Sequence, residues 1–255
     1  MPGFAALNRE GNSFEFDSAR VDALRAALRG TLVGANDAGY HESRSVWNAM
    51  IDRRPALIAR CIGTADIIAC VNFARETGIA LSIKGGGHNI AGLAVAEGGL
   101  MIDCSGMRGA WVDPKARIAH AQAGCTLGDV DRETQVHGLA AVLGFVSLTG
   151  TAGLTLGGGF GYISRRFGYT TDNVKSMTLV TADGKLVRTS ELDNADLFWG
   201  LRGGGGNFGV LTDIEYALYP LGPEIYGGGI AWSAEQAPEV FKLYDKIASE
   251  APQEL

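Results

Sequence analysis

The chain has 255 residues, of which 46% are hydrophobic and 20% charged, and its formal net charge is −6. The acidic balance argues against non-specific nucleic-acid binding, which depends on clustered Lys and Arg, and no apolar run approaches the ~20 residues of a membrane span. We therefore expect a cytoplasmic globular protein that has no signal peptide and binds neither nucleic acid nor membrane.

The first third of the chain alternates between helix and strand signals. Apolar residues at helical spacing predict helices over 17–30 and 64–78, and each of these segments ends at a glycine. Short apolar runs predict strands at 55–61, 80–85 and 99–105. This order indicates a split α/β unit in which the strand at 80–85 runs straight into three glycines.

Short strands dominate the later part of the chain. Strands are predicted at 116–125 and 208–220, helices at 126–138 and 194–203, and a hairpin from 176–184 and 185–190 with a preferred Asp-Gly turn at Asp183-Gly184. Beyond Pro220 the pattern predicts one strand and one helix that begin a new region. We expect the α+β fold class, with one continuous body up to residue 220.

Two familiar motif classes do not fit the sequence. Gly204, Gly206 and Gly209 match G-x-G-x-x-G, but a predicted helix precedes them and a predicted strand follows, which is the reverse of a dinucleotide-binding turn. The four cysteines lie at irregular spacings without a C-x-x-C pair. No metal site is predicted, and the cysteines are expected to be buried thiols.

Glycine is the unusual component of this sequence. The chain has 37 glycines, about twice the number that average usage of ~7% predicts. They gather at 85–87, 157–161, 203–206 and 227–229. Such clusters mark places where the backbone turns sharply or approaches a ligand closely.

The richest glycine segment, 144–173, interleaves seven glycines with small hydroxyl side chains between Gly144 and Gly161. Bare N–H groups form anion-binding nests and hydroxyls add uncharged donors, which suits a pyrophosphate in an acidic protein. A segment in which helices cross tightly would have the same composition. From this stretch alone the two interpretations remain equally open.

His88 directly follows the triple glycine 85–87. A loop histidine is more often a hydrogen-bonded structural residue, but the glycines remove side chains from the approach to its ring, so a flat ligand could lie against the backbone. The other histidines, His41, His120 and His137, lack such surroundings and are expected to be structural.

Several segments resemble, in the same order, the flavin domain of the berberine-bridge-enzyme-like oxidoreductases of the vanillyl-alcohol-oxidase superfamily. They are RRPALIARC (53–61), KGGGHNIAG (84–92), MIDCSGMRG (101–109), AGCTLGDV (123–130), TGTAGLTLGGGFGYISRRFGYTTDNV (149–174), VTADGKLV (180–187) and DLFWGLRGGGGNFGVLTDIEYALYP (196–220). The resemblance implies a PCMH-type FAD-binding fold over 1–220, with the flavin between α/β subdomains at roughly 1–105 and 106–220. Residues 221–255 would then begin an incomplete substrate domain.

The resemblance also implies a set of cofactor-binding residues. His88 would be bonded covalently to the 8α-methyl group of FAD. The pyrophosphate and ring edge would lie against Lys84, Gly85, Gly86, Gly87, Asn89 and Gly92. The other wall would come from Ser147, Thr149, Gly150, Gly153, Leu154, Gly157, Gly159, Gly161 and Tyr162, and the adenine or ribose would contact Gly209 and Val210.

Many family members carry a second bond from a cysteine whose place here falls on Val146. Cys104 and Cys125 lie in segments that are near the flavin in the family, but nothing suggests that they attach. At most one covalent link, through His88, is therefore expected.

The implied activity is that of an FAD-dependent oxidoreductase. It would transfer a hydride from an alcohol, sugar or amine carbon to the bound FAD, with molecular oxygen as electron acceptor and a small molecule as substrate. Family members are about twice as long, so the catalytic base is expected beyond Leu255. Two alternatives remain: an inert flavin-binding module or subunit that needs a partner chain, and a non-covalent flavin reductase of the muramate-pathway type, which generally lacks this histidine.

Overall fold

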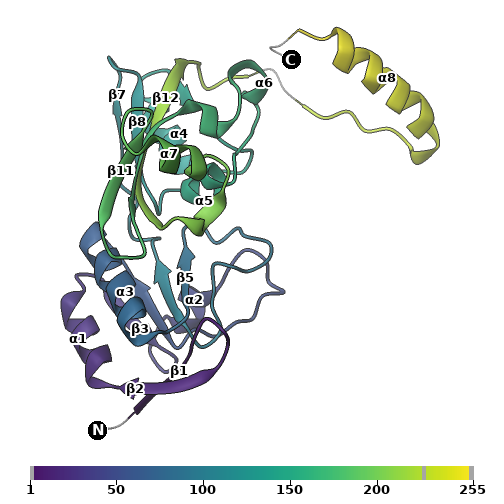
Figure 1. Ribbon diagram of the computed structural model, residues 1–255. Coiled ribbons are helices and arrows are strands. Elements are labelled where there is room, and N and C mark those ends of the chain that lie inside the picture. The colour runs from purple at the N-terminus through teal and green to yellow at the C-terminus, as the bar shows by residue number, and fades with distance from the viewer. Residues whose placement is uncertain (1–2, 226–227, 253–255) are drawn as a thin grey trace.

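The computed structural model describes residues 3–225 and 228–252. Figure 1 shows two β-sheets, one above the other, with helices around them and a separate helix at the C-terminal end. The lower sheet comes from the first part of the chain and the upper sheet from the part after residue 109.

The first sheet is mixed and has the order β3-β4-β6-β5. Its strands are β3 (Thr31–Gly34), β4 (Leu57–Arg60), β5 (Leu81–Lys84) and β6 (Leu100–Asp103). β6 runs parallel to β4 and β5, so the carboxyl ends of these three strands lie at one edge of the sheet. The hairpin of β1 (Gly3–Leu7) and β2 (Ser13–Asp17) and the helices α1 (Ala19–Ala27), α2 (Tyr40–Arg44) and α3 (Thr64–Thr77) complete this half.

The second sheet is antiparallel throughout, with the order β11-β10-β12-β8-β7 and β9 paired to β12. Its strands are β7 (Ala110–Asp113), β8 (Ile118–Gln122), β9 (Leu139–Ala141), β10 (Val174–Val180), β11 (Leu186–Ser190) and β12 (Val210–Pro220). The helices are α4 (Leu127–Gln135), α5 (Thr151–Leu156), α6 (Ser164–Phe167) and α7 (Ala195–Leu201), with 3-10 turns η1 (Thr170–Asn173) and η2 (Gly205–Asn207).

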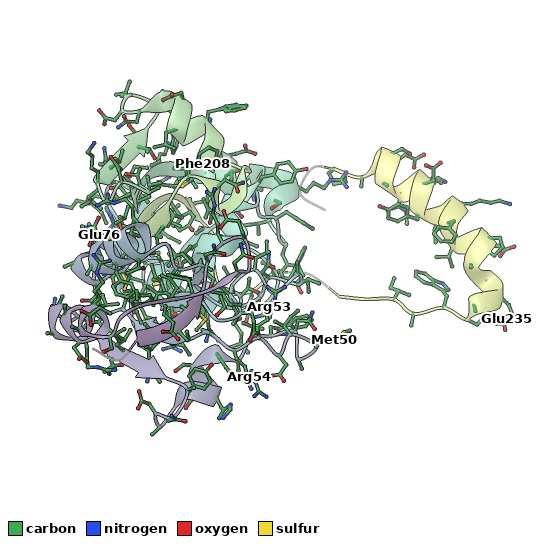
Figure 2. The ribbon with its side chains drawn as sticks, turned by 60° about the horizontal axis from the view of Figure 1, so that its bottom comes forward. Met50, Arg53, Arg54, Glu76, Phe208 and Glu235 are labelled. Atoms are coloured by element: carbon green, nitrogen blue, oxygen red, sulfur yellow. The ribbon has the colours of Figure 1, made fainter. Side chains whose placement is uncertain are left out.

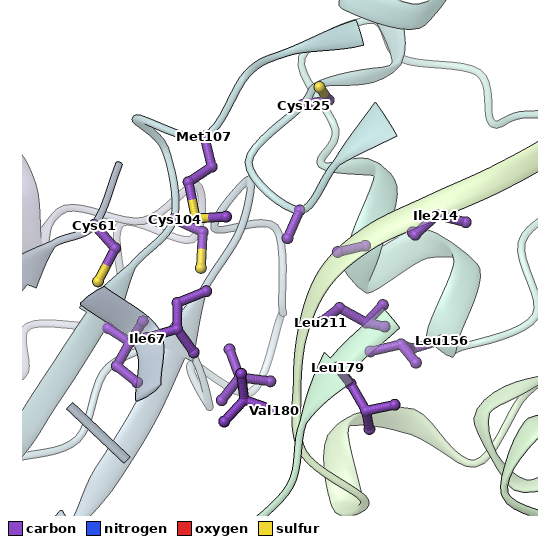
Figure 3. Close-up of a cluster of buried hydrophobic side chains, with 14 of the residues drawn as sticks. Cys61, Ile67, Cys104, Met107, Cys125, Leu156, Leu179, Val180, Leu211 and Ile214 are labelled. Atoms are coloured by element: carbon purple, nitrogen blue, oxygen red, sulfur yellow. The ribbon is translucent and has the colours of Figure 1, made fainter. Parts of the chain in front are cut away.

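One hydrophobic core joins the two halves. Buried side chains of α3 and β4 belong to the same cluster as those of β10 and β12, and Figure 3 shows Ile67, Val180 and Leu211 together in it. Burying apolar side chains from both halves in one cluster stabilises their relative placement. The shared core therefore fixes how the two halves are placed relative to each other.

Most predicted elements are present with shorter bounds. Four predicted helices are present as α1, α3, α4 and α7, which lie within the ranges 17–30, 64–78, 126–138 and 194–203. The predicted strands up to residue 220 are present as β4, β5, β6, β8, β10, β11 and β12. The α+β expectation is thus confirmed. The turn of the hairpin is longer than the predicted two-residue Asp-Gly turn. The N–H of Thr181 bonds to the carbonyl of Lys185, so three residues lie between this pair. Of Asp183 and Gly184, only Gly184 has positive φ (79°).

The C-terminal helix α8 (Ala237–Glu250) lies apart from the body (Figures 1 and 2). It follows the 3-10 turn η3 (Ala234–Gln236), and none of its side chains is buried. The helix predicted beyond Pro220 is present, whereas no strand forms at 221–225 or 228–236; the remaining residues of the predicted strand, 226–227, lie outside the described ranges. Within the described residues no helix combines the length and apolarity needed to cross a bilayer.

Candidate functional site

The two glycine-rich segments meet at Gly86 and Gly150. A Cβ atom on either residue would overlap the backbone nitrogen of the other, so the main chains touch only because both lack side chains. The second segment is fixed by hydrogen bonds from the N–H of Thr151 to the carbonyl of Cys125 and from the N–H of Leu127 to the carbonyl of Thr149, each 2.9 Å long. The structure thus brings together Gly86 and Gly150, which lie 64 positions apart in the chain (150 − 86).

The first segment begins where β5 ends at the sheet edge. We call residues 85–90 the histidine loop. Within the described part of the chain, the main-chain N–H groups of Gly86, Gly87 and His88 donate no hydrogen bond to the protein. Successive N–H groups without a protein acceptor and a positive φ, here at Gly87 (71°), are features of the nests that bind anions.

The side chain of Lys84 lies beneath this loop rather than facing a ligand. Its Nζ donates a hydrogen bond of 2.6 Å to the carbonyl of Ser43 and lies 3.9 Å from Oδ2 of Asp103. Only 12% of the Lys84 side chain is exposed. The carbonyl of Lys84 accepts a hydrogen bond from the N–H of Cys104, so both its amine and its carbonyl have partners within the protein. A contact of Lys84 with a cofactor stays a prediction.

His88 is partly exposed and stacks against Trp47, with ring centroids 5.8 Å apart and an interplanar angle of 19°. Sequence reasoning did not identify Trp47. The segment around it has neither helical nor strand periodicity, and its only signal was an isolated aromatic residue before an asparagine. The contact between Trp47 and His88 is visible only in the folded chain.

The second wall contains both open and packed glycines. A Cβ on Gly153 would meet nothing within 4 Å, and one on Gly157 would meet only carbonyls of its own helix. By contrast, a Cβ on Gly161 would overlap the carbonyl of Leu143, and one on Gly159 would crowd Thr170. Tight packing therefore accounts for Gly159 and Gly161, whereas Gly153 and Gly157 leave backbone open to a ligand.

The remaining predicted residues occupy varied surroundings. The amide oxygen of Asn89 accepts a hydrogen bond from the N–H of Leu93. Gly92 has positive φ and packs against Ile51. Tyr162 is exposed, and its ring meets that of Phe145 edge to face, with 4.8 Å between the ring centroids. Ser147 and Thr149 take part in main-chain bonds beside α4, and the Leu154 side chain lies near Gly144 and Gly159.

Gly209 and Val210 lie at the start of β12. Val210 is 3% exposed and its main chain pairs with Val180 in the sheet, so little of this residue is open to a ligand. The neighbouring turn η2 packs beside α5. A contact of this region with the adenine or ribose stays a prediction.

None of the four cysteines is available as an attachment point. All four are buried, and burial raises the pKa of Cys104 to about 12 and that of Cys125 to about 11. Such thiols are protonated at neutral pH, and it is the thiolate that reacts. Among the described residues, no group of three His, Cys, Asp or Glu side chains is arranged to hold a metal ion.

The arrangement fits the pyrophosphate and flat ring of FAD. The nest at 86–88 offers N–H donors to an anion, and the glycine contact between residues 86 and 150 leaves bare main chain on both sides of the junction. Two hollows on the surface lie elsewhere: one of about 220 Å³ between α1 and α3, and one of about 500 Å³ beside Asn8 and Phe14. Neither is lined by any of the predicted cofactor-binding residues.

Comparison with known proteins identifies relatives along most of the chain. The FAD binding domain family matches residues 55–190. The chain is 35% identical to (R)-6-hydroxynicotine oxidase of Paenarthrobacter nicotinovorans over 227 residues, which cover 89% of this chain and 49% of that protein. The crystal structure of 6-hydroxy-D-nicotine oxidase from Arthrobacter nicotinovorans superposes with a TM-score of 0.84 at 34% identity, covering 88% of this chain and 50% of that one.

A third relative is informative about the cofactor. It is the glucooligosaccharide oxidase of Acremonium strictum, which carries 6-S-cysteinyl, 8α-N1-histidyl FAD; the TM-score is 0.74 at 33% identity, covering 78% of this chain and 42% of that one. The chain spans about half the length of the relatives it matches. Its family match, fold and glycine-lined surface agree, and the chain belongs to the FAD binding domain family of the FAD-linked oxidoreductases, within the vanillyl-alcohol-oxidase superfamily.

Proposed function

We propose that this chain holds FAD, through a single covalent bond from His88, in an oxidoreductase that removes a hydride from an amine, alcohol or sugar carbon. The observation that carries the proposal is the partly exposed imidazole of His88 at the end of a nest of free N–H groups. Bound FAD would supply the hydride acceptor, while the chain's own residues bind and orient it.

The substrate class rests on the relatives. They are named as oxidases of 6-hydroxynicotine and of glucooligosaccharides, so an amine or a sugar carbon is the proposed site of oxidation, with molecular oxygen as acceptor. The residues at 84–89 and 147–153 would fix the cofactor and not the substrate. Because the chain spans about half of each relative, the catalytic base is proposed to lie outside this sequence.

Attachment at His88 has a definite stoichiometry. An N–C bond replaces one N–H bond of the imidazole and one C–H bond of the 8α-methyl group. The two hydrogens would leave as two protons and two electrons. Bound FAD would supply the acceptor for both electrons, and dioxygen would be the final oxidant, reduced to hydrogen peroxide. His88 is therefore a tether and not the base that takes the substrate proton.

A second bond is not proposed. The position of the cysteinyl link falls on Val146, which is 53% exposed and has no nucleophilic atom. All four thiols are buried, and burial raises the pKa values of Cys104 and Cys125. One FAD per chain, attached once, is the expected product.

We also propose that residues 1–220 form the FAD-binding unit, with subdomains at roughly 1–105 and 106–220, and that a substrate-binding region begins at 221. The two sheets on either side of residue 105 and the loss of packing beyond Leu221 support this division. Leu221 still donates its N–H to the carbonyl of Gly138, whereas α8 has no buried residue.

The test is a denaturing gel of the purified protein, viewed for flavin fluorescence after acid treatment. We expect fluorescence at the protein band, a mass increase of one FAD, and the loss of both in His88→Ala. His137→Ala serves as a control because His137 lies outside the site. Fluorescence that persists in the His88 variant would show that the tether is elsewhere.

A second candidate is a flavin-binding module that requires a partner chain for turnover. The observation that favours it is the half-length match to the relatives. Turnover of 6-hydroxynicotine or of oligosaccharides by this chain alone would exclude that candidate.

A further inference from the structure

A short segment that follows β3 in the chain lies along the histidine loop. We call residues 43–48 the strap. The strap contains the end of α2 and the residues after it, and Lys84 anchors its first residue by the 2.6 Å bond from Nζ to the carbonyl of Ser43. The two segments are joined at their starts before the loop reaches His88.

Two further hydrogen bonds join the strap to the loop on either side of His88. The main-chain N–H of Trp47 donates to the carbonyl of Gly87 over 3.0 Å, and Nδ2 of Asn48 donates to the carbonyl of Ile90 over 2.8 Å. Since a glycine with positive φ, such as Gly87, has wide conformational freedom, fixing its carbonyl restricts the direction in which the next residue leaves the turn.

The Trp47 indole then limits the histidine ring itself. Trp47 is 62% exposed, and its ring stacks on the imidazole with 5.8 Å between centroids and 19° between planes. Offset stacking is a preferred geometry for aromatic pairs. The backbone on both sides of His88 and one face of its ring are therefore set by two adjacent residues of the strap.

We propose that Trp47 and Asn48 are positioning residues that hold the His88 imidazole in the orientation required for bonding to FAD. This inference rests on the proposed function of His88 as the tether. A nucleophile held close to the reacting geometry reacts faster than one that must find it, and a displacement of about 1 Å can cost a factor of about 100 in rate. The strap should thus affect attachment and not FAD binding as such.

The experiment follows covalent attachment in apoprotein produced under riboflavin limitation. FAD is added, samples are denatured in acid at intervals, and fluorescence at the protein band is compared with the total flavin bound before denaturation. We expect Trp47→Ala and Asn48→Ala to slow attachment at least about tenfold, while Trp47→Phe, which keeps a stacking ring, stays within about threefold of the unmodified chain. Total bound FAD should be unchanged in all three.

The matched control is Trp111→Ala. Trp111 is also exposed (55%) and also stacks on a histidine, His120, at 3.6 Å, but on β7 and β8 away from the loop. This variant should attach FAD at the normal rate. If Trp47→Ala and Asn48→Ala attach FAD as fast as Trp111→Ala, the positioning role is wrong.

Two other outcomes are distinguishable. If the unmodified chain binds FAD but shows no fluorescence at the protein band, the proposed tether itself is wrong and the inference is lost with it. If Trp47→Ala fails to fold by circular dichroism, Asn48→Ala decides the test, because it removes one donor and leaves the indole in place.

Discussion

Individual glycines in the two rich segments have different structural roles. Gly86 and Gly150 allow two main chains to touch, Gly159 and Gly161 allow tight packing inside one half, and Gly153 faces open space. Composition alone could not separate these roles, because each requires the same absence of a side chain. The partner atoms that surround the missing Cβ decide which role applies.

Gly150→Ala should disrupt the junction between the segments. The new methyl group would overlap the backbone nitrogen of Gly86, and overpacking of this kind costs about 1–3 kcal/mol. We expect a lower thermal unfolding midpoint and a reduced ratio of flavin to protein. Gly153→Ala is the control: its Cβ meets nothing within 4 Å in α5, so stability should be unchanged or should rise by up to about 1 kcal/mol. An equal fall in the unfolding midpoint of the two variants would contradict the assigned contact.

Asp213 predicts a pH dependence of stability. Burial, with a smaller contribution from Glu215, raises the pKa of Asp213 to about 6. The pKa of Asp213 is higher in the folded protein than in the unfolded chain. The contribution of Asp213 to the free energy of unfolding is therefore fully present below about pH 4 and is lost as the pH rises through 6. A shift of this size corresponds to about 3 kcal/mol, which partial exposure of the carboxyl reduces to about 1 kcal/mol.

Asp213→Asn should therefore stabilise the protein at pH 8 and not at pH 4, as measured by urea unfolding at both values. Asp245→Asn on the exposed helix α8 provides the control and should change stability at neither pH. A gain at pH 4 as large as that at pH 8 would mean that the carboxyl is not the cause.

Among the helices and strands, the strength of the local sequence pattern decided what could be predicted. Helix α3 was expected because fourteen residues show a continuous apolar face and a glycine stop at Gly78. Strands β4, β5 and β6 have only four residues each, but they were expected because each lies in a distinct apolar run. Strands β1, β2, β3, β7 and β9 have three to five residues and were not expected, because their segments show neither such a run nor a clear alternation. Helix α5 was missed for a different reason: its sequence contains a glycine and two threonines, which are weak helix formers.

Helix α8 should contribute little to the stability of the body. Its apolar residues, among them Phe241, Tyr244 and Ile247, are exposed. The side chain of Arg165 in the body donates a hydrogen bond to the carbonyl of Ala251, directly after the helix. Deleting residues 222–255 should shift the unfolding midpoint by less than about 2 °C.

Deletion of residues 1–34, the same length, is the comparison. That segment carries buried Val21, Leu24 and Leu32, so its loss should lower the midpoint strongly or prevent folding. If calorimetry shows equal losses for the two deletions, α8 packs on the body in solution.

In the molecule as a whole, the candidate site depends on the core that the two sheets share. The histidine loop follows an edge strand of the first sheet, and Gly150 precedes a helix packed within the second half. The common cluster that contains Ile67 and Val180 holds these halves together. The loop and its opposite wall therefore depend on packing that lies far from either in sequence.

Motif order and local periodicity are properties of neighbouring residues, and they were enough to predict the family, the α+β class, the two glycine-rich segments and His88 as the candidate tether. Tertiary structure alone decided that Gly86 touches Gly150, that the Lys84 amine is used on Ser43, and that Trp47 and Asn48 flank His88. The physical reason is that such contacts join residues about 40 to 65 positions apart, and no local pattern records which distant atoms the folded chain brings within a few ångströms.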